Sequence, residues 1–381
     1  SKLEHFNLIF SKVPTLRFAE FTDEWEKYEL SHFVTRITRR NKNNESSLPL
    51  TISAQYGLVD QISFFNKTVA SVDLSGYYLL YNGDFAYNKS YSNEYAWGAV
   101  KRLDKYEKGC LSSLYFVFRP NDNVDSDYLT HYFESSKWHK GISNIAGEGA
   151  RNHGLLNMAV DDYFATKHCL PSLPEQKKIA RFFNAITRRI EIQNKIISKY
   201  ETLIKGLCDM IFRYNKSVSL SDLVKCKTSA LQENMVSTCH RGEYKVLGAS
   251  GAIAAIDTYQ FEESGILVLK DGSKAGKIQF AQGKYSVVGT SVVLIPNEAC
   301  DARYLYFAMS SIDFEKYKVG SGIPHIYFKD YSNERIYYPD KALRKKITKT
   351  LDFYETMVEI ERKMLSAMQK QKAFLLQSMF I

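Results

Sequence analysis

Two long amphipathic segments dominate the pattern of apolar and polar positions along this chain. Between Pro174 and Tyr214 there is no other proline and a single glycine, and apolar residues recur at alternating steps of three and four. The two sets of positions are Ile179, Ile186, Tyr200 and Leu207, and Phe183, Ile190, Ile197, Ile204 and Ile211. This heptad pattern predicts a helix of about 38 residues, or roughly 57 Å, with one face against a partner helix.

The same pattern returns 168 residues later, near the end of the chain. Pro171 and Phe212 correspond to Pro339 and Phe380, without a gap over 42 residues. The second copy carries Ile347, Tyr354, Met368 and Leu375, then Leu351, Val358, Leu365 and Met379, with Lys372 where the first has Ile204. Such a stripe often packs on its own domain, but roughly five heptads exceed a typical helix of about three turns. We therefore expect the two helices to pack on each other.

One polar residue interrupts each heptad set near the midpoint of its helix, Gln193 in the first and Glu361 in the second. A pseudo-twofold axis across an antiparallel pair brings equivalent midpoint residues face to face. We predict that the Gln193 amide donates to the Glu361 carboxylate and fixes the helix-pair register.

The rest of the chain indicates strand-rich domains. Short β-branched and aromatic runs, such as 265–270, alternate with clusters of Gly, Asn, Asp and Ser. Similar motifs follow in the same order in both halves: 56–59 with 250–253, 112–120 with 290–296, 127–133 with 303–309, and 147–149 with 320–322.

This order predicts a tandem α+β fold with an internal pseudo-twofold repeat. Its parts are a first globular domain at 1–170, a central helix at 171–214, a second globular domain at 215–338 and a C-terminal helix at 339–381. The two helices form an antiparallel coiled coil.

Composition and charge narrow the class of partner. The 381 residues are 45% hydrophobic and 14% aromatic, which favours two or more ordered domains. The net charge is +9, and the helical stretches 175–212 (eight basic, four acidic) and 341–381 (nine basic, four acidic) account for all of it. The positive balance favours a polyanionic partner, which the globular domains can hold only through local clusters.

The sequence indicates neither a membrane-spanning segment nor a metal-binding site. No apolar run reaches the roughly 18 residues that a span needs, and residues 1–7 lack the order of a signal peptide, so we expect a cytoplasmic protein. Six cysteines are scattered without a Cys-x-x-Cys pair or a His at ligand spacing, which predicts reduced thiols and no metal site.

Catalytic motifs are incomplete. Residues 272–278 (GSKAGKI) have three residues between glycines and no hydroxyl after the lysine, unlike a phosphate-binding loop. Residues 147–152 (GEGARN) lack the third glycine of a dinucleotide fingerprint. The chain also has no His-Glu-x-x-His, no Gly-x-Ser-x-Gly and no Asn/Asp-Pro-Pro-Tyr/Phe sequence. We expect no catalytic residue and no bound cofactor, and a recognition role instead.

Local polar clusters at matching loops are the candidates for DNA contact. They are Lys89, Tyr91, Arg151, Asn152, His153, Lys270, Ser273, Lys274, Lys277 and His325.

Three stretches resemble the specificity subunits of type I restriction-modification systems. They are 14–25 (PTLRFAEFTDEW), 157–164 (NMAVDDYF) and 170–180 (LPSLPEQKKIA), the last of which is similar to the family's entry into its central helix. The tandem layout extends the resemblance over nearly the whole chain. Leu343 and Arg344 replace the Glu-Gln pair in the second copy.

The resemblance implies a sequence-specific DNA-binding subunit without its own chemistry. Each domain reads one half of a split, asymmetric double-stranded DNA site, and the helices set the gap. Glu175 and Gln176 belong to the motif that docks the partners. Those partners are two adenine-N6 methyltransferase subunits, which use S-adenosylmethionine, and restriction-translocase subunits, which use ATP and Mg²⁺.

Two other functions remain open from the residues. A coiled-coil scaffold joining protein-binding modules predicts no salt-sensitive, sequence-selective DNA affinity. A nuclease with a hidden carboxylate cluster predicts metal-dependent activity in the isolated chain.

Overall fold

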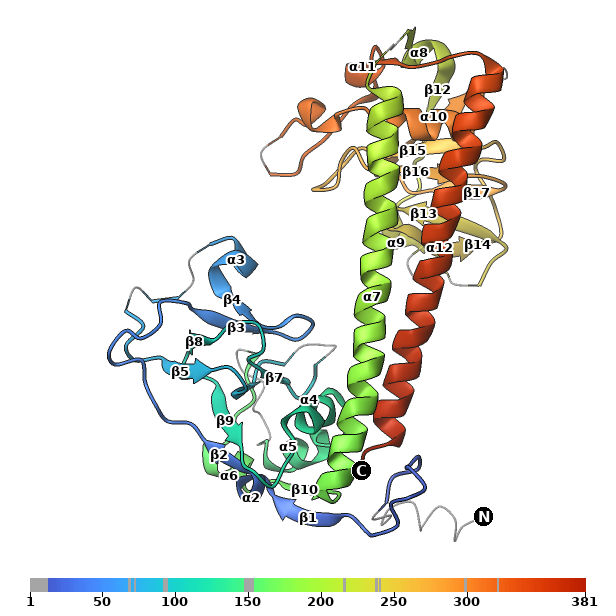
Figure 1. Ribbon diagram of the computed structural model, residues 1–381. Helices are drawn as coiled ribbons and strands as arrows, with labels where there is room; N and C mark the ends of the chain where they lie inside the picture. Colours follow the sequence, from blue (N-terminus) through green and yellow to red (C-terminus); the bar gives the residue numbers. More distant parts are fainter. Residues whose placement is uncertain are drawn as a thin grey trace. The chain divides into compact units, whose positions relative to one another are not determined.

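The computed structural model describes residues 13–381 apart from 68–69, 72, 92–94, 147–153, 215–216, 237–238, 240, 298–299 and 321. It divides into two compact units (Figure 1). Each unit has a hydrophobic core of its own. Unit 1 consists of residues 1–192 and 364–381, and unit 2 consists of residues 193–363. Each unit therefore contains one strand-rich domain together with one end of each long helix.

The long helices are α7 (Leu173–Phe212) and α12 (Lys341–Ser378). They pack side by side and run antiparallel, since the partner numbers on α12 fall as those on α7 rise. In unit 1 the rings of Phe183 and Phe380 lie 5.7 Å apart, and in unit 2 those of Tyr200 and Tyr354 lie 6.4 Å apart. The predicted pairing of the two helices, with their heptad positions turned inward, is confirmed.

The globular part of unit 1 is built on a four-stranded antiparallel sheet with the order β2-β9-β6-β7. The strand pairs β1-β10, β3-β4 and β5-β8 surround it. Its elements are β1 (Glu26–Glu29), α2 (Leu30–Phe33), β2 (Val34–Arg36), β3 (Leu50–Ser53), β4 (Gly57–Asp60), α3 (Gln61–Phe65), β5 (Tyr78–Tyr81), β6 (Phe85–Asn88), β7 (Ala99–Arg102), β8 (Lys108–Leu111), β9 (Phe116–Pro120), α4 (Ser126–Glu134), α5 (His139–Ile145), α6 (Val160–Phe164) and β10 (Lys167–Leu170).

Unit 2 repeats this plan with the sheet β12-β18-β15-β16. A three-stranded sheet, β14-β13-β17, and the pair β11-β19 complete it. Its elements are β11 (Val218–Ser219), α8 (Leu220–Leu223), β12 (Val224–Thr228), α9 (Glu233–Val236), β13 (Tyr244–Gly248), β14 (Gly251–Ile256), β15 (Gly265–Leu269), β16 (Ile278–Ala281), β17 (Tyr285–Val287), β18 (Ser291–Pro296), α10 (Ala302–Met309), η2 (Phe314–Tyr317), α11 (Phe328–Tyr331) and β19 (Arg335–Ile336).

The two main sheets share topology and register. Phe85 of β6 faces Phe118 of β9, and Ile266 of β15 faces Leu294 of β18. Pro120 and Pro296 end the corresponding strands, and a helix follows each (α4 and α10). The strand-rich α+β fold predicted from the sequence is confirmed, and the repeated topology accounts for the loosely repeated motifs. In the part of the chain that the structure describes, no helix combines the length and the apolar character needed to cross a bilayer.

Candidate nucleic-acid interface and helix contacts

The midpoint residues of the long helices meet within unit 2. Gln193 is only 5% exposed, and its Nε2 donates to the Glu361 carboxylate and, at 3.2 Å, to the Glu361 backbone carbonyl. The structure thus places these two side chains in contact. Their role in fixing the register remains a prediction.

Removing the acceptor tests that role. Glu361→Ala is expected to destabilise unit 2 by about 1–3 kcal/mol, because the buried Gln193 amide loses a charged partner. Chemical denaturation of the purified chain measures the effect. Glu359, 68% exposed and paired with Lys363 on the outer surface, is the matched control, and Glu359→Ala is expected to change stability by less than about 0.5 kcal/mol. Equal effects of both substitutions would contradict the role.

Glu175 and Gln176, expected to dock partner subunits, are buried within unit 1 instead. Glu175 is 1% exposed and accepts two hydrogen bonds from the Arg17 guanidinium, at 2.8 and 2.7 Å. Gln176 is 2% exposed, accepts from the Asp125 backbone N–H at 2.8 Å and donates to the Pro171 carbonyl at 2.9 Å. The docking assignment is therefore corrected, because both side chains join the start of α7 to its own unit and neither is exposed to a partner subunit.

The second helix keeps one of these bonds with a different residue. Arg344, 168 positions after Gln176, donates from Nη1 to the Pro339 carbonyl at 2.6 Å, and Pro339 is likewise 168 positions after Pro171. The guanidinium also lies 4.1 Å from the centre of the Tyr338 ring. The second copy lacks the Glu-Gln pair, but it keeps the hydrogen bond between the start of the helix and the carbonyl of the preceding proline.

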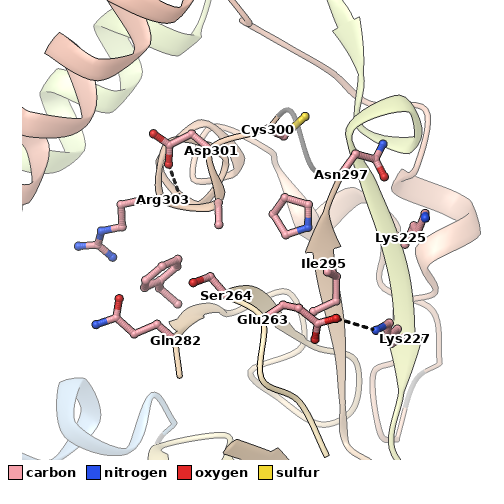
Figure 2. Close-up of a pocket in the computed structure, with 13 residues that line it drawn as sticks. Lys225, Lys227, Glu263, Ser264, Gln282, Ile295, Asn297, Cys300, Asp301 and Arg303 are labelled. Atoms are coloured by element: carbon pink, nitrogen blue, oxygen red, sulfur yellow. Dashed lines mark hydrogen bonds and ion pairs between the residues drawn. The ribbon is translucent and has the colours of Figure 1, made fainter. Parts of the chain in front are cut away.

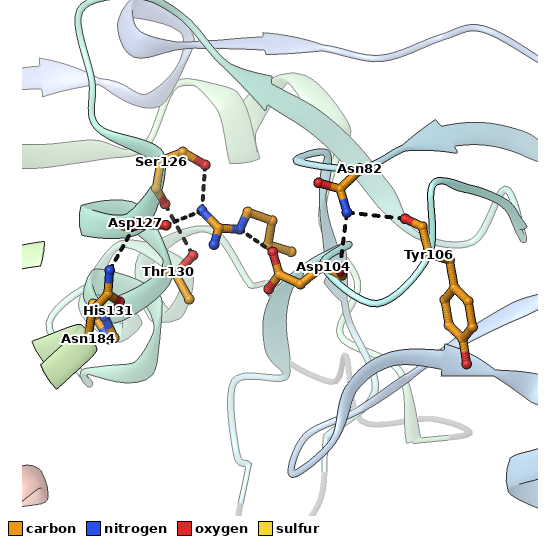
Figure 3. A network of polar contacts seen from close by, with 9 residues as sticks. Asn82, Asp104, Tyr106, Ser126, Asp127, Thr130, His131 and Asn184 are labelled. Atoms are coloured by element: carbon orange, nitrogen blue, oxygen red, sulfur yellow. Dashed lines mark hydrogen bonds and ion pairs between the residues drawn. The ribbon is translucent and has the colours of Figure 1, made fainter. Parts of the chain in front are cut away.

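Polar contacts join α4 to α7 in unit 1 (Figure 3). Arg102 donates to Asp104 at 2.6 Å and to Asp127 at 2.7 Å, while Asn184 of α7 donates to the other oxygen of Asp127 at 2.8 Å. Beside them, the Asn82 amide donates to the backbone carbonyls of Asp104 and Tyr106 (Figure 3). These contacts join the sheet, its loops and the long helix within unit 1.

Unit 2 has the same joint with the charges exchanged. Arg303 of α10 donates to Asp352 of α12 at 2.5 Å and also pairs with Glu355. Asp352 is 168 positions after Asn184, so the same helix position carries an acid here and an amide in unit 1. The different side chains preserve a direct polar link between α4 and α7 in unit 1 and between α10 and α12 in unit 2.

Glu134 of α4 links this helix to α12 in unit 1. It accepts from His131 at 3.1 Å and pairs with Lys372 at 2.9 Å, and Lys372 also donates to Thr187 at 2.8 Å. Burial alone would raise the pKa of Glu134, but the His131 hydrogen bond and the Lys372 charge outweigh it and lower the pKa to about 2. The lysine that interrupts the second heptad set is thus satisfied by an ionised carboxylate.

The candidate DNA contacts of unit 2 gather at one loop. Lys270 follows the end of β15, and Ser273, Lys274 and Lys277 are exposed on the way to β16. His325 comes from a distant segment, yet its Nδ1 lies 2.7 Å from Asp271 in the same loop. The structure therefore brings all five predicted residues to this loop and to the segment bridged to it.

The candidates of unit 1 are only partly described. Lys89 follows β6, and its ammonium lies 4.6 Å from the centre of the Phe116 ring, while burial lowers its pKa. Tyr91 is hydrogen-bonded through its backbone to Gly154 at 3.1 Å. The predicted contacts at residues 151–153 (Arg, Asn and His) lie outside the described residues, next to Gly154 in sequence.

A hollow of about 1020 Å³ in unit 2 was not anticipated from the sequence (Figure 2). Its lining mixes Lys225, Lys227 and Arg303 with Glu263 and Asp301. Lys227 pairs with Glu263 at 3.6 Å, and the guanidinium of Arg303 is held by the long helix. Lys225 and Lys227 lie on β12, where alternation within an edge strand gave the only sequence signal, and Arg303 lies on α10.

No group of three or more His, Cys, Asp or Glu side chains converges as a metal site among the described residues. The polar clusters described above are ion pairs and hydrogen-bonded joints, and they lack a nucleophile paired with a base. Their arrangement suits binding and positioning.

Comparison with known proteins shows which family the chain resembles. Residues 214–369 match the model of the type I restriction modification DNA specificity domain. The S subunit of a type I restriction-modification system from M. genitalium has the same fold, with a TM-score of 0.59 and 16% identity, over 97% of this chain and 99% of that one. The chain is therefore similar to the specificity subunits of type I restriction-modification systems, in the family match of residues 214–369 and in its fold.

Two further comparisons agree with this similarity. A structure described as the basis of complex assembly and conformational transition of the type I R-M system matches with a TM-score of 0.55 and 15% identity, covering 94% of this chain and 98% of the other. The type I restriction enzyme MjaVIII specificity subunit of Methanocaldococcus jannaschii is 28% identical over 122 residues. That match covers 31% of this chain and spans about 28% of the curated relative's length.

Proposed function

We propose that this chain selects the DNA target of a type I restriction-modification complex. Unit 1 reads one half of a bipartite, asymmetric double-stranded site and unit 2 reads the other. The chain itself performs no chemistry. The observation that carries the proposal is the repeated sheet: two domains of one topology each end their inner strand, β6 or β15, at a loop that begins with a lysine and presents polar side chains.

The two long helices set the distance between the two DNA-reading domains and dock the partner subunits. Two methyltransferase subunits, which use S-adenosylmethionine, dock on the subunit, and restriction-translocase subunits add ATP and Mg²⁺ chemistry in the cytoplasm. The excess positive charge lies on the stretches 175–212 and 341–381. Such basic helices suit either the phosphates of the gap or acidic surfaces of the partners.

Methylation mapping tests the proposal. The chain is co-expressed with the methyltransferase subunit encoded beside it, and methylated adenines are mapped on plasmid DNA by single-molecule sequencing. A bipartite motif with a fixed gap is expected, and it should disappear without the chain. Co-purification of the two proteins without sequence-selective methylation would instead favour a scaffold.

The length of the helices predicts the length of the gap. Seven residues inserted after Gln193 together with seven after Glu361 preserve the heptad register and lengthen each helix by about 10.5 Å. At 3.4 Å per base pair, the gap is expected to grow by about three base pairs while both half-sites stay unchanged. The same motif mapping measures it. An insertion in one helix alone breaks the pairing and is expected to abolish methylation, and an unchanged gap with both insertions would contradict the ruler role.

A further inference from the structure

The loop after β15 is held by a short backbone ladder. The carbonyl of Lys270 accepts from the N–H of Ile326 at 2.9 Å, and the N–H of Gly272 donates to the carbonyl of Pro324 at 2.9 Å. Between these two bonds, Asp271 and His325 face each other as a bridge pair. The backbone of His325 also exchanges hydrogen bonds with Val319, at 2.8 and 2.9 Å. The pair is therefore fixed from both sides.

Unit 1 contains the same ladder after β6. The carbonyl of Lys89 accepts from the N–H of Leu156 at 3.0 Å, and the N–H of Tyr91 donates to the carbonyl of Gly154 at 3.1 Å. The facing residues between these bonds are Ser90 and Leu155.

The two ladders match position by position. Lys89 and Lys270 both directly follow the inner strand of the sheet. Leu156 and Ile326, which donate to them, are both buried, at 4% and 1% exposure. One backbone arrangement thus presents an acid and a histidine in unit 2, and a hydroxyl and an aliphatic side chain in unit 1.

The chemistry of the unit 2 pair defines what it can recognise. A carboxylate only accepts hydrogen bonds, so the 2.7 Å contact with Asp271 Oδ1 places a proton on Nδ1 of His325. Nε2 is then an acceptor in the neutral ring and a donor in the charged ring. The His325 side chain is 41% exposed, and no hydrogen bond to its Nε2 is formed by the described residues. An oriented ring nitrogen of this kind is suited to one edge of a base in a groove.

We propose that this facing pair is a specificity-determining position in each unit, Asp271 with His325 in unit 2 and Ser90 with Leu155 in unit 1. His325 contacts a base edge, and Asp271 is a positioning residue that sets its tautomer. Leu155 offers an apolar contact, of the type that distinguishes a thymine methyl group. The different pairs on one scaffold make the two half-sites different. This inference rests on the proposed function.

Variants of the pair in the complete methyltransferase complex test the inference. His325→Ala is expected to slow methylation of the cognate site about tenfold or more and to relax one base pair of one half-site. The other half-site and the gap should be unchanged. Asp271→Asn should relax the same base pair to a smaller extent. The double variant Ser90→Asp with Leu155→His should change the opposite half-site.

His32→Ala is the matched control, because His32 is an exposed histidine of unit 1 that stacks on Tyr28 at 4.4 Å outside the ladder. It is expected to leave the motif and the rate unchanged. Circular dichroism and thermal unfolding confirm that each variant is folded, and His325→Gln replaces His325→Ala if the latter is not. Folded His325 variants with the original motif and rate would overturn the inference. Absence of a bipartite motif for the unaltered complex would instead overturn the proposed function.

Discussion

Replacing Glu175 by alanine is expected to destabilise unit 1 by about 3–5 kcal/mol. The substitution leaves the Arg17 guanidinium, 13% exposed, without the carboxylate that accepts two of its hydrogen bonds. Urea or guanidinium denaturation of the purified chain measures the loss. Because Arg17 belongs to the N-terminal segment, the expected structural consequence is release of that segment from the start of α7.

The same two segments provide a control. Lys178 and Glu20 also form an ion pair, but their side chains are 44% and 49% exposed. Lys178→Ala is expected to cost at most about 1 kcal/mol, since exposed pairs are screened by solvent. The double variant Arg17→Ala with Glu175→Ala should recover part of the loss by removing the unpaired charge. A Glu175→Ala effect no larger than that of Lys178→Ala would refute the buried-pair argument.

Acidification is expected to destabilise unit 1 through His168. This residue is 3% exposed, its Nδ1 lies 2.7 Å from the Tyr132 hydroxyl, and its Nε2 lies 2.8 Å from the Thr166 hydroxyl. The Thr166 hydroxyl donates to the Tyr163 carbonyl, so it accepts from Nε2–H, and Nδ1 accepts from Tyr132. Both ring nitrogens are satisfied in the neutral form.

Burial lowers the pKa of His168 from 6.5 to about 4. The unfolded chain binds this proton near pH 6.5 and the folded chain only near pH 4, so the stabilisation present above pH 6.5 is lost as the pH falls between these values. The loss is about 3 kcal/mol. Denaturation midpoints at several pH values measure it, with His168→Gln as the reference, since its pH dependence should lack this component. Parallel profiles would show that His168 titrates alike in both states.

Glu134 acts in a separate, more acidic window. Its pKa is lowered to about 2 from 4.5, so the stability it contributes is complete above pH 4.5 and is lost as the pH falls towards 2. The two windows overlap only between about pH 4 and 4.5, so the His168 effect is read above pH 4.5 without interference from Glu134.

The helix pair was the most predictable part of the molecule. Heptad spacing depends only on local sequence, and the constant offset of 168 residues places equivalent positions without knowledge of tertiary contacts. The meeting of Gln193 with Glu361 could be anticipated for the same reason. Antiparallel pairing of two related helices leaves little freedom for their midpoints.

The burial of Glu175 and Gln176 could not be predicted in this way. An acid and an amide near the start of a basic helix are typical of an exposed helix terminus, so the sequence predicts exposure for both residues. Their partners Arg17 and Asp125 are far away in sequence, and a single sequence carries no signal for such pairs. Exposure at helix ends is set by tertiary packing and not by helical periodicity.

The proposed recognition loops, which follow β6 and β15, could be predicted only in part. The sequence predicts the lysines after β6 and β15 as candidates, but it does not show that they are equivalent, because the ladder is made by backbone atoms. Ser90 and Leu155 have no residue in common with Asp271 and His325. A loop held by its main chain leaves its side chains free to differ, which is why sequence comparison aligned the strands and not the facing pair.

The Pro339 anchor shows how two copies of one segment diverge without losing their shape. An amide in one copy and a guanidinium in the other reach the same carbonyl, five residues earlier in the chain. The two copies share the hydrogen bond to the proline carbonyl, although different side chains donate it. Substitution tables score Gln176 against Arg344 as a mismatch, so ancestry inferred from identity alone underestimates how much of the duplication survives.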